Sequence, residues 1–196
     1  MNEDEVWLTA DPSDLWVLDK LILSLNLGYS CGPIGVDVPS AGYYIVRPAV
    51  NALGLGLGAE KVWIEESTDD LPLGFFWCEW FEGRHLSVDF KDGKCLFVVE
   101  GTKESNTFTK WTKWEKVDVD CELPEILIPL VEKYQTINVE MIGDKIIEVH
   151  LRGNPDFVYG NKDFIPVWEG QKIDVPKGYK YIECEELHGR VGALIS

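Results

Sequence analysis

The sequence predicts an α+β protein in which short antiparallel strands outnumber helices. Runs rich in aromatic and β-branched residues recur along most of the chain, and two helical patterns are inserted at separate places. Apolar residues make up 45% of the chain, which supports a packed core. The helical patterns cover residues 12–27 and 122–134, and the strand-like runs cover residues 43–47, 61–65, 75–81, 85–90, 94–100, 136–142 and 145–152.

Glycines and prolines mark the limits of these elements. The first helical pattern stops at Gly28, and the pair Asp92-Gly93 predicts a tight hairpin turn between two of the strands. Beyond residue 160 the chain is dotted with prolines and glycines, so we expect an irregular tail. The predicted organisation is an acidic segment at residues 1–14, a core at residues 15–160 and a C-terminal extension at residues 161–196 that packs on the core.

The composition excludes several classes of partner. The net charge is −16, so phosphates of nucleic acids and anionic membranes would repel the chain. No run of 18 apolar residues is present, and the acidic N-terminus lacks the basic start of a secretory signal. The five cysteines are odd in number and far apart, which gives no disulfide framework or paired-cysteine metal site. We expect a cytoplasmic protein that binds neither nucleic acid nor membranes.

A glycine-rich loop is the first candidate binding element. Gly54, Gly56 and Gly58 alternate with leucines between two predicted strands, and Arg47 ends the strand before them. Glycines let backbone N–H groups approach a phosphate, and a guanidinium suits phosphate oxygens. The loop has neither the Walker A pattern nor the dinucleotide-binding spacing. A plain hairpin connector fits the glycines equally well, and Arg47 favours the phosphate loop.

The hairpin at residues 136–152 carries two glutamates whose relative position follows from its register. A simple two-residue turn at Gly143-Asp144 would mix buried and polar faces. An odd loop or an equivalent bulge keeps the faces separate. That register sets Ile147 opposite Met141, Val149 opposite Val139, Glu140 opposite Glu148, and Asn138 opposite His150.

Two carboxylates directly opposite each other on a sheet repel, so their charge must be relieved. A shared proton, a neighbouring cation or a bound divalent metal would each do this. Two carboxylates beside an amide or imidazole, with open positions for phosphate oxygens, suit Mg²⁺. An exposed, solvated acidic face is the competing interpretation.

Three segments, in order along the chain, resemble the ATP-grasp family. Residues 43–59 resemble its strand and glycine-rich flap, residues 76–90 its hinge strand, and residues 137–152 its metal-binding hairpin. Asp19-Lys20 is similar to a recurrent pair near the start of these domains. The resemblance covers about residues 15–160. It implies two small lobes of antiparallel sheet and helix, a flap lobe at about residues 30–80 and a metal lobe at about residues 81–160, with a nucleotide between them.

The resemblance also implies a role for each matching position. The cofactors would be ATP and Mg²⁺. The nucleotide contacts would be Arg47 on the phosphates, Gly54, Gly56 and Gly58 folded over them, the backbone of Glu79, Trp80 and Phe81 at the adenine, and His85 near the ribose. Glu140 and Glu148 would bind Mg²⁺, with His150 or Asn154 beside it, and Arg152 would be the catalytic residue that stabilises the transferred phosphoryl group.

Three positions depart from the family pattern, because Arg47, His85 and His150 stand where lysine, glutamate and asparagine are usual. The family also carries an N-terminal substrate domain, whereas only 14 residues precede the core here, so a protein partner could supply that domain. The function implied is a carboxylate–amine type ligase that forms an acyl phosphate and uses a small carboxylate or peptide-like acceptor. A non-catalytic nucleotide-binding module is one alternative. A carbohydrate- or protein-binding β domain is another, supported by the exposed-looking Trp111 and Trp114.

Overall fold

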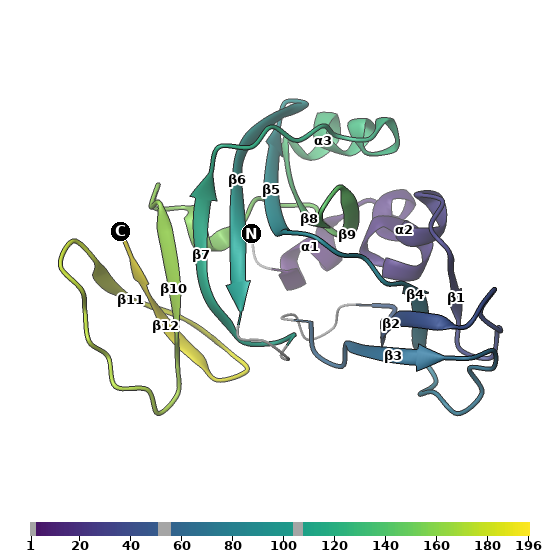
Figure 1. Ribbon diagram of the computed structural model, residues 1–196. Coiled ribbons are helices and arrows are strands. Elements are labelled where there is room, and N and C mark those ends of the chain that lie inside the picture. The colour runs from purple at the N-terminus through teal and green to yellow at the C-terminus, as the bar shows by residue number, and fades with distance from the viewer. Residues whose placement is uncertain (1–2, 51–55, 104–107) are drawn as a thin grey trace.

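Two antiparallel sheets of unequal size form the framework of the computed structural model, which describes residues 3–50, 56–103 and 108–196 (Figure 1). The small sheet has four strands in the order β1-β4-β2-β3. Their bounds are Cys31–Pro33 for β1, Gly42–Pro48 for β2, Glu60–Ile64 for β3 and Phe75–Glu79 for β4. This sheet corresponds to the segment expected as the flap lobe.

The large sheet has eight strands in the order β11-β12-β10-β7-β6-β5-β8-β9. Its first five strands along the chain are β5 (His85–Lys91), β6 (Lys94–Lys103), β7 (Trp111–Val117), β8 (Thr136–Ile142) and β9 (Lys145–His150). The last three are β10 (Asp163–Trp168), β11 (Lys180–Leu187) and β12 (Arg190–Ile195). The observed class is α+β, as the strand-rich pattern predicts.

The single helix expected at residues 12–27 is divided in two. A 3₁₀ helix, η1, spans Pro12–Leu18, and α2 spans Lys20–Asn26. Between them Asp19 is extended and its carboxylate accepts hydrogen bonds from the backbone of Leu21 and Ile22, which makes it the N-cap of α2. The break turns Lys20 toward the sheets instead of solvent, and its side chain is buried.

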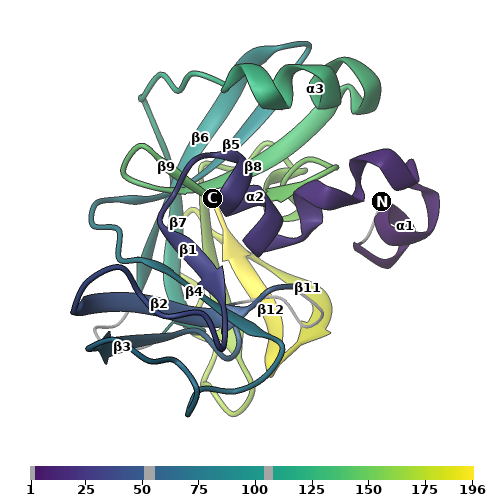
Figure 2. The same cartoon turned by 90° about the vertical axis from the view of Figure 1, so that its right-hand side faces the viewer.

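The remaining helices are short. They are α1 (Glu3–Thr9), the 3₁₀ turn η2 (Glu125–Leu127), α3 (Ile128–Tyr134) and the 3₁₀ turn η3 (Pro155–Phe157). Figure 2 shows α3 and the small sheet at opposite ends of the molecule. Within the described ranges, no helix is long and apolar enough to cross a membrane.

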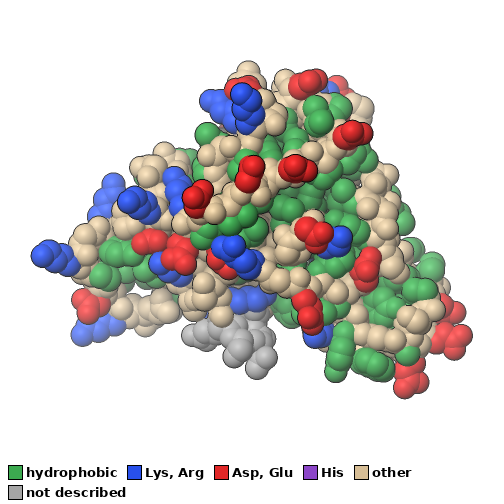
Figure 3. All heavy atoms as spheres, turned by 45° about the horizontal axis from the view of Figure 1, so that its top comes forward, with side chains coloured by type: hydrophobic (Ala, Val, Ile, Leu, Met, Phe, Trp, Pro, Cys, Tyr) green, Lys and Arg blue, Asp and Glu red, His purple; other side chains and the backbone are tan. Residues whose placement is uncertain are grey.

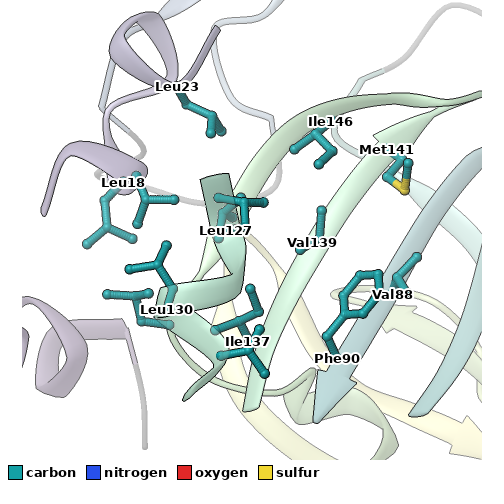
Figure 4. Packing of buried hydrophobic residues seen from close by; sticks show 14 of the residues in the cluster. Leu18, Leu23, Val88, Phe90, Leu127, Leu130, Ile137, Val139, Met141 and Ile146 are labelled. Atoms are coloured by element: carbon teal, nitrogen blue, oxygen red, sulfur yellow. The ribbon is translucent and has the colours of Figure 1, made fainter. Parts of the chain in front are cut away.

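One face of the large sheet packs against the helices. Figure 4 shows Leu18, Leu23, Leu127 and Leu130 from the helical segments close to apolar side chains of β5, β8 and β9. On β5 the residues that face this core are Leu86, Val88 and Phe90, which alternate with the polar residues of the opposite face. The helices therefore leave the polar face of these strands turned toward the small sheet.

A second cluster buries the two tryptophans of β7. Trp111 and Trp114 of β7 are only 7% and 8% exposed, and they pack with Phe157, Phe164 and neighbours on β12. The rings of the two tryptophans lie 4.4 Å apart between centroids. They are therefore core residues, which removes the support that they gave to the alternative of a carbohydrate- or protein-binding β domain.

The C-terminal extension is not irregular, contrary to the expectation. It forms β10, β11 and β12, which continue the large sheet beyond β7. Proline is tolerated in β10 because the pairing with β7 covers only Asp163 and Phe164, so Pro166 lies beyond it with one edge unpaired.

The surface charge is dispersed on the face shown in Figure 3. Acidic side chains are scattered there among basic and apolar ones. The net charge of −16 is therefore not gathered into a single patch on this face.

Gly101 of β6 offers a test of the tryptophan packing. A Cβ at this position would lie 2.5 Å from Trp111 Cζ3 and 2.8 Å from Trp114 Cη2. We expect Gly101→Ala to lower the free energy of unfolding by about 2 kcal/mol, because both rings must move. Denaturant unfolding measures this, with Gly42→Ala as the matched control, since the Cβ at that strand glycine finds its nearest atom at 3.7 Å. Equal stability of the two variants would contradict the packing.

Candidate functional site

Six polar residues form two rows on the face of the large sheet that is turned away from the helical core. The pairing of β5, β8 and β9 sets Ser87, Glu140 and Glu148 side by side in one row, and Asp89, Asn138 and His150 in the next. All of these residues except Glu140 are less than 10% exposed, and the side chain of Glu140 is 26% exposed. The predicted opposition of the two glutamates, and of Asn138 and His150, is confirmed.

The register is reached through a β-bulge. The turn at Gly143-Asp144 is a two-residue turn, since Ile142 pairs with Lys145, and the register then shifts between Glu140 and Met141. Met141 pairs with Ile146, so the expected pairing of Met141 with Ile147 is wrong. The carbonyl of Ile147 accepts a hydrogen bond of 2.9 Å from Arg47 Nη2. The bulged strand thus connects the large sheet to β2 of the small sheet.

Cations relieve the repulsion between the opposed glutamates. Lys20 Nζ lies 3.2 Å from Glu148 Oε2, and the two side chains are 6% and 12% exposed. His85 Nε2 lies 3.1 Å from Glu140 Oε2. His150 Nε2 lies 3.5 Å from Glu148 Oε1. Of the three ways of relieving the charge that the sequence leaves open, a neighbouring cation, Lys20, is present in the protein itself, and the two histidines add positive charge when they are protonated.

The electrostatics of the site are dominated by burial. Burial alone would raise the pKa of Glu140, but the hydrogen bond from His85 and the positive charges of His85, His150 and Lys20 lower it overall. Burial lowers the pKa of Lys20, and the nearby charge of Arg47 lowers it further, against the opposing effect of Glu148. Burial also lowers the pKa of Arg47. An additional anion beside Lys20 and Arg47 would stabilise both cations.

Three buried nitrogens around this site have no hydrogen-bond partner among the residues that the structure describes. They are Nε of Arg47, Nε1 of Trp80 and Nδ1 of His85. Buried polar atoms in proteins are nearly always paired, so three together indicate a polar ligand. They come from β2, from the connection between the two sheets and from β5, and therefore surround the junction of the sheets.

The connection between β4 and β5 is held mainly by Glu79 and Phe81. Glu79 Oε1 accepts a hydrogen bond from the Ser30 backbone N–H, and the Glu79 N–H donates to the Ser30 carbonyl. The ring of Phe81 meets Tyr29 edge-on at 4.9 Å between centroids. Lys61 Nζ of β3 lies 4.2 Å from the centre of the Trp80 ring. The side chain and the backbone N–H of Glu79 thus both bind Ser30, so the predicted backbone contact with a ligand would have to come from Trp80 or Phe81.

The described part of the glycine loop approaches the large sheet. Gly56 and Gly58 have φ values of 67° and 76°, a conformation that glycine adopts without strain. A Cβ on Gly56 would lie 3.1 Å from the carbonyl oxygen of Phe108, which precedes β7. Gly54 lies outside the described residues. The loop between β2 and β3 therefore reaches across the junction toward the β6–β7 connection.

Asn154 and Arg152 lie just after β9. Asn154 Oδ1 accepts from the Asp156 N–H and caps η3, while its own N–H donates to both carboxylate oxygens of Asp89. Arg152 Nη1 donates to the Gly153 carbonyl. Asn154 is therefore engaged in supporting Asp89, and His150 is the residue beside Glu148.

Sequence reasoning passed over Lys20, Ser87 and Asp89 as site residues. The signal for the last two is the alternation on β5, where every second residue from His85 is polar. Lys20 appears in the sequence only as half of a recurrent pair. Its contact with Glu148, which is 128 positions away, carries no local signal.

In the described part of the chain, no group of three or more His, Cys, Asp or Glu residues is arranged to hold a metal ion. Glu140 and Glu148 are nevertheless two opposed carboxylates. Mg²⁺ commonly takes only one or two protein carboxylates and completes its shell with phosphate oxygens and water. The donor set therefore fits a Mg²⁺ ion that arrives with a phosphate ligand, and does not fit a metal held by protein ligands alone.

Comparison with solved structures gives several matches of low sequence identity. Carboxyaminoimidazole ribonucleotide synthase from Aspergillus clavatus, complexed with ATP, matches 98% of this chain and 72% of its own, with 9% identity and a TM-score of 0.53. A protein from Archaeoglobus fulgidus assigned to the ATP-grasp superfamily matches 91% and 64%, with 17% identity and a TM-score of 0.46. The ATP-grasp ligase PsnB, complexed with minimal precursor, Mg and ADP, matches 76% and 55%, with 13% identity and a TM-score of 0.45.

The first of these matches, with a TM-score of 0.53, shows a shared fold and not a shared reaction. The chain spans 64% of the A. fulgidus protein and 55% of PsnB, so both are considerably longer than the part that it matches. No protein-family model and no curated protein matches the sequence.

Proposed function

We propose that this chain, which has the ATP-grasp fold, binds ATP with Mg²⁺ at the junction of its two sheets and uses it to activate a carboxylate for ligation. The observation that carries the proposal is the direct opposition of Glu140 and Glu148 beside the buried cations Lys20 and Arg47. Four charged groups at one junction match the needs of a bound metal–triphosphate. The carboxylates suit the metal, and the cations suit the phosphate oxygens.

Lys20 and Arg47 are the phosphate ligands in this proposal. Arg47 already uses Nη2 to bind the Ile147 carbonyl, which fixes the guanidinium beside the glutamates and leaves Nε for an acceptor. When Glu148 binds a metal ion, phosphate oxygens would replace it as the anionic partner of Lys20. Gly56 and Gly58 would offer backbone N–H groups from the opposite side.

Glu140 and Glu148 would hold Mg²⁺. When bound, the ion would neutralise negative charge on the phosphates. Asn138, Asn154 and Ser87 would then act as supports, because they hydrogen-bond to Asp89 or to each other and hold β5 and β8 in position under the glutamates. The hinge segment around Trp80 and His85 would receive the base and ribose.

The reaction class that we propose is carboxylate activation by phosphoryl transfer. A carboxylate placed in line with the terminal phosphate would form an acyl phosphate, which an amine then attacks. Arg152 would stabilise negative charge on the transferred phosphoryl group, since it follows β9 directly after the glutamate and histidine of the site. The acceptor would be a small carboxylate or a peptide-like molecule.

Arg47 provides the direct test of nucleotide binding. We expect Arg47→Gln to weaken Mg-ATP binding by about 10–100-fold, because a charge-assisted hydrogen bond to phosphate is lost. Titration calorimetry measures the affinity, and Arg84→Gln is the matched control, because Arg84 is 48% exposed and pairs with Glu100 on the surface. Equal affinities of the two variants would reject Arg47 as a phosphate ligand.

Turnover is tested separately from binding. Phosphate release would be measured with Mg-ATP and a panel of carboxylates and amines. Release that depends on both substrates supports the ligase. Binding without release under any combination would favour the alternative of a non-catalytic nucleotide-binding module.

A further inference from the structure

Arg190 is a largely buried cation that the proposed nucleotide site does not use. It is the first residue of β12, in the C-terminal part of the large sheet. Its Nη1 donates to Asp156 Oδ2 at 2.9 Å, and the two side chains are 13% and 20% exposed. The ring of Phe164 lies 5.5 Å from the guanidinium carbon and flanks its plane. Two contacts, with Asp156 of η3 and with Phe164 of β10, thus orient this side chain.

The Nε of Arg190 is buried and has no hydrogen-bond partner within the described ranges. A guanidinium carries five N–H donors in a rigid fork. Asp156 occupies Nη1, whereas Nε and Nη2 form the edge that binds a carboxylate or phosphate with two parallel hydrogen bonds. An oriented guanidinium with an unpaired Nε is a preorganised anion receptor.

Arg190 is also close to the candidate active site. Asp156 belongs to η3, which begins only a few residues after Arg152 and β9. The Asp156 N–H donates to Asn154 Oδ1, and the Asn154 amide in turn donates to Ser87, which pairs with Glu140. Asp156 therefore stands between Arg190 and the glutamate site.

The distribution of arginine strengthens this reading. The chain contains 34 acidic residues but only four arginines, Arg47, Arg84, Arg152 and Arg190. Arg84 forms an exposed pair with Glu100. The other three come from β2, from the segment after β9 and from β12.

We infer that Arg190, held by Asp156 and Phe164, forms a subsite for an anionic group, a carboxylate or a phosphate, of the acceptor substrate. The inference rests on the proposed function, because it places this group beside the carboxylate that the nucleotide activates. It restricts the acceptor to molecules that carry an anionic group besides the reacting one. It also gives the C-terminal strands a part in substrate selection.

Side-chain NMR of the full chain tests the subsite directly. Four arginines give four Nε–Hε resonances, and the resonance of Arg84 serves as an internal reference. With Mg-AMPPNP at saturation, so that the nucleotide site is filled, the protein is titrated with succinate in one series and inorganic phosphate in another. We expect a saturable shift of the Arg190 resonance and none of Arg84. A response to succinate alone identifies a carboxylate, and a response to phosphate alone identifies a phosphate.

The variant Arg190→Gln should weaken binding of the responding probe by at least about 10-fold, as expected for a lost charge-assisted hydrogen bond. Its affinity for Mg-ATP should stay that of the wild type, and Arg190→Lys should recover part of the anion binding. An unmoved Arg190 resonance in both titrations, with nucleotide bound, overturns the subsite, even if the glutamine variant fails to fold. Absence of Mg-nucleotide binding with a responsive Arg190 would instead reject the proposed function and leave the anion subsite standing.

Discussion

Replacing Glu148 with Gln is expected to weaken Mg-ATP binding by about 10–100-fold, the range for losing metal affinity through a supporting residue and a minimum for a direct ligand. The same change should destabilise the metal-free protein by about 3 kcal/mol, because it leaves Lys20 buried without its carboxylate. The sequence alone suggests the opposite sign for stability, since it shows only two opposed carboxylates. The short contact between Lys20 and Glu148, with both side chains nearly inaccessible, reverses that expectation.

A double variant separates the two effects. Lys20→Met combined with Glu148→Gln removes both buried charges, and should regain most of the lost stability, since no unpaired charge is left buried. It should not regain Mg-ATP affinity. Denaturant unfolding and calorimetry measure the two quantities, with Glu100→Gln as the control for an exposed pair that contributes less than about 1 kcal/mol. A Glu148→Gln variant that binds Mg-ATP like the wild type would eliminate the metal site.

Alanine substitutions of the neighbours Asp89 and Phe90 should each lower the free energy of unfolding, for different reasons. Phe90 is 1% exposed in the helical core, so Phe90→Ala should cost about 4 kcal/mol through cavity formation. Asp89 accepts hydrogen bonds from the Asn138 amide and the Asn154 N–H on the opposite face. Asp89→Ala should cost about 2–3 kcal/mol, because these donors are left buried, while relief of the desolvated carboxylate offsets part of the loss.

Of these two variants, only Asp89→Ala should weaken the binding of Mg-ATP. Asn138 and Asn154 lose their common acceptor in it, so Mg-ATP affinity should fall by about 10-fold, as for a supporting residue of a metal site. The folded fraction of Phe90→Ala should bind Mg-ATP as the wild type does. Calorimetry at a temperature where both variants are folded makes the comparison. Equal loss of affinity in both variants would mean that the site responds to general destabilisation and not to Asp89.

Local patterning was sufficient to predict the acidic hairpin. Strand alternation has a period of two, so a face that must be buried determines which residues stand opposite each other. That argument gives the pairing of Glu140 with Glu148 but not the identity of the residue that bulges, since Ile146 and Ile147 are equally apolar. The turn at Asp92-Gly93 was likewise predictable, and both residues have positive φ, 50° and 75°.

Contacts between distant segments explain what the sequence did not predict. The helical pattern at residues 12–27 is continuous, yet the Lys20 N–H donates to the Ala49 carbonyl and Asp19 pairs with Val50, which breaks the helix there. Trp111 and Trp114 are buried by residues of η3 and β10, and no local pattern near residue 111 predicts these contacts. Prolines disfavour strands, so the sequence of the extension does not predict them. In the structure Pro166 lies beside an unpaired edge of β10, where proline is tolerated.

The connection of Arg47 to Ile147 has a consequence for how the chain acquires its native state. These residues are 100 positions apart. Glu148 lies on β9, an edge strand, and β9 must pair with β8 before Lys20 and Arg47 can contact their partners. Most of the pairings that shape the site are similarly long-range, a topology associated with refolding in milliseconds to seconds. During synthesis the basic residues emerge well before the acidic hairpin, and their charges remain hydrated until it follows. Binding competence should therefore arise late and in a single cooperative step, together with the closing of the large sheet.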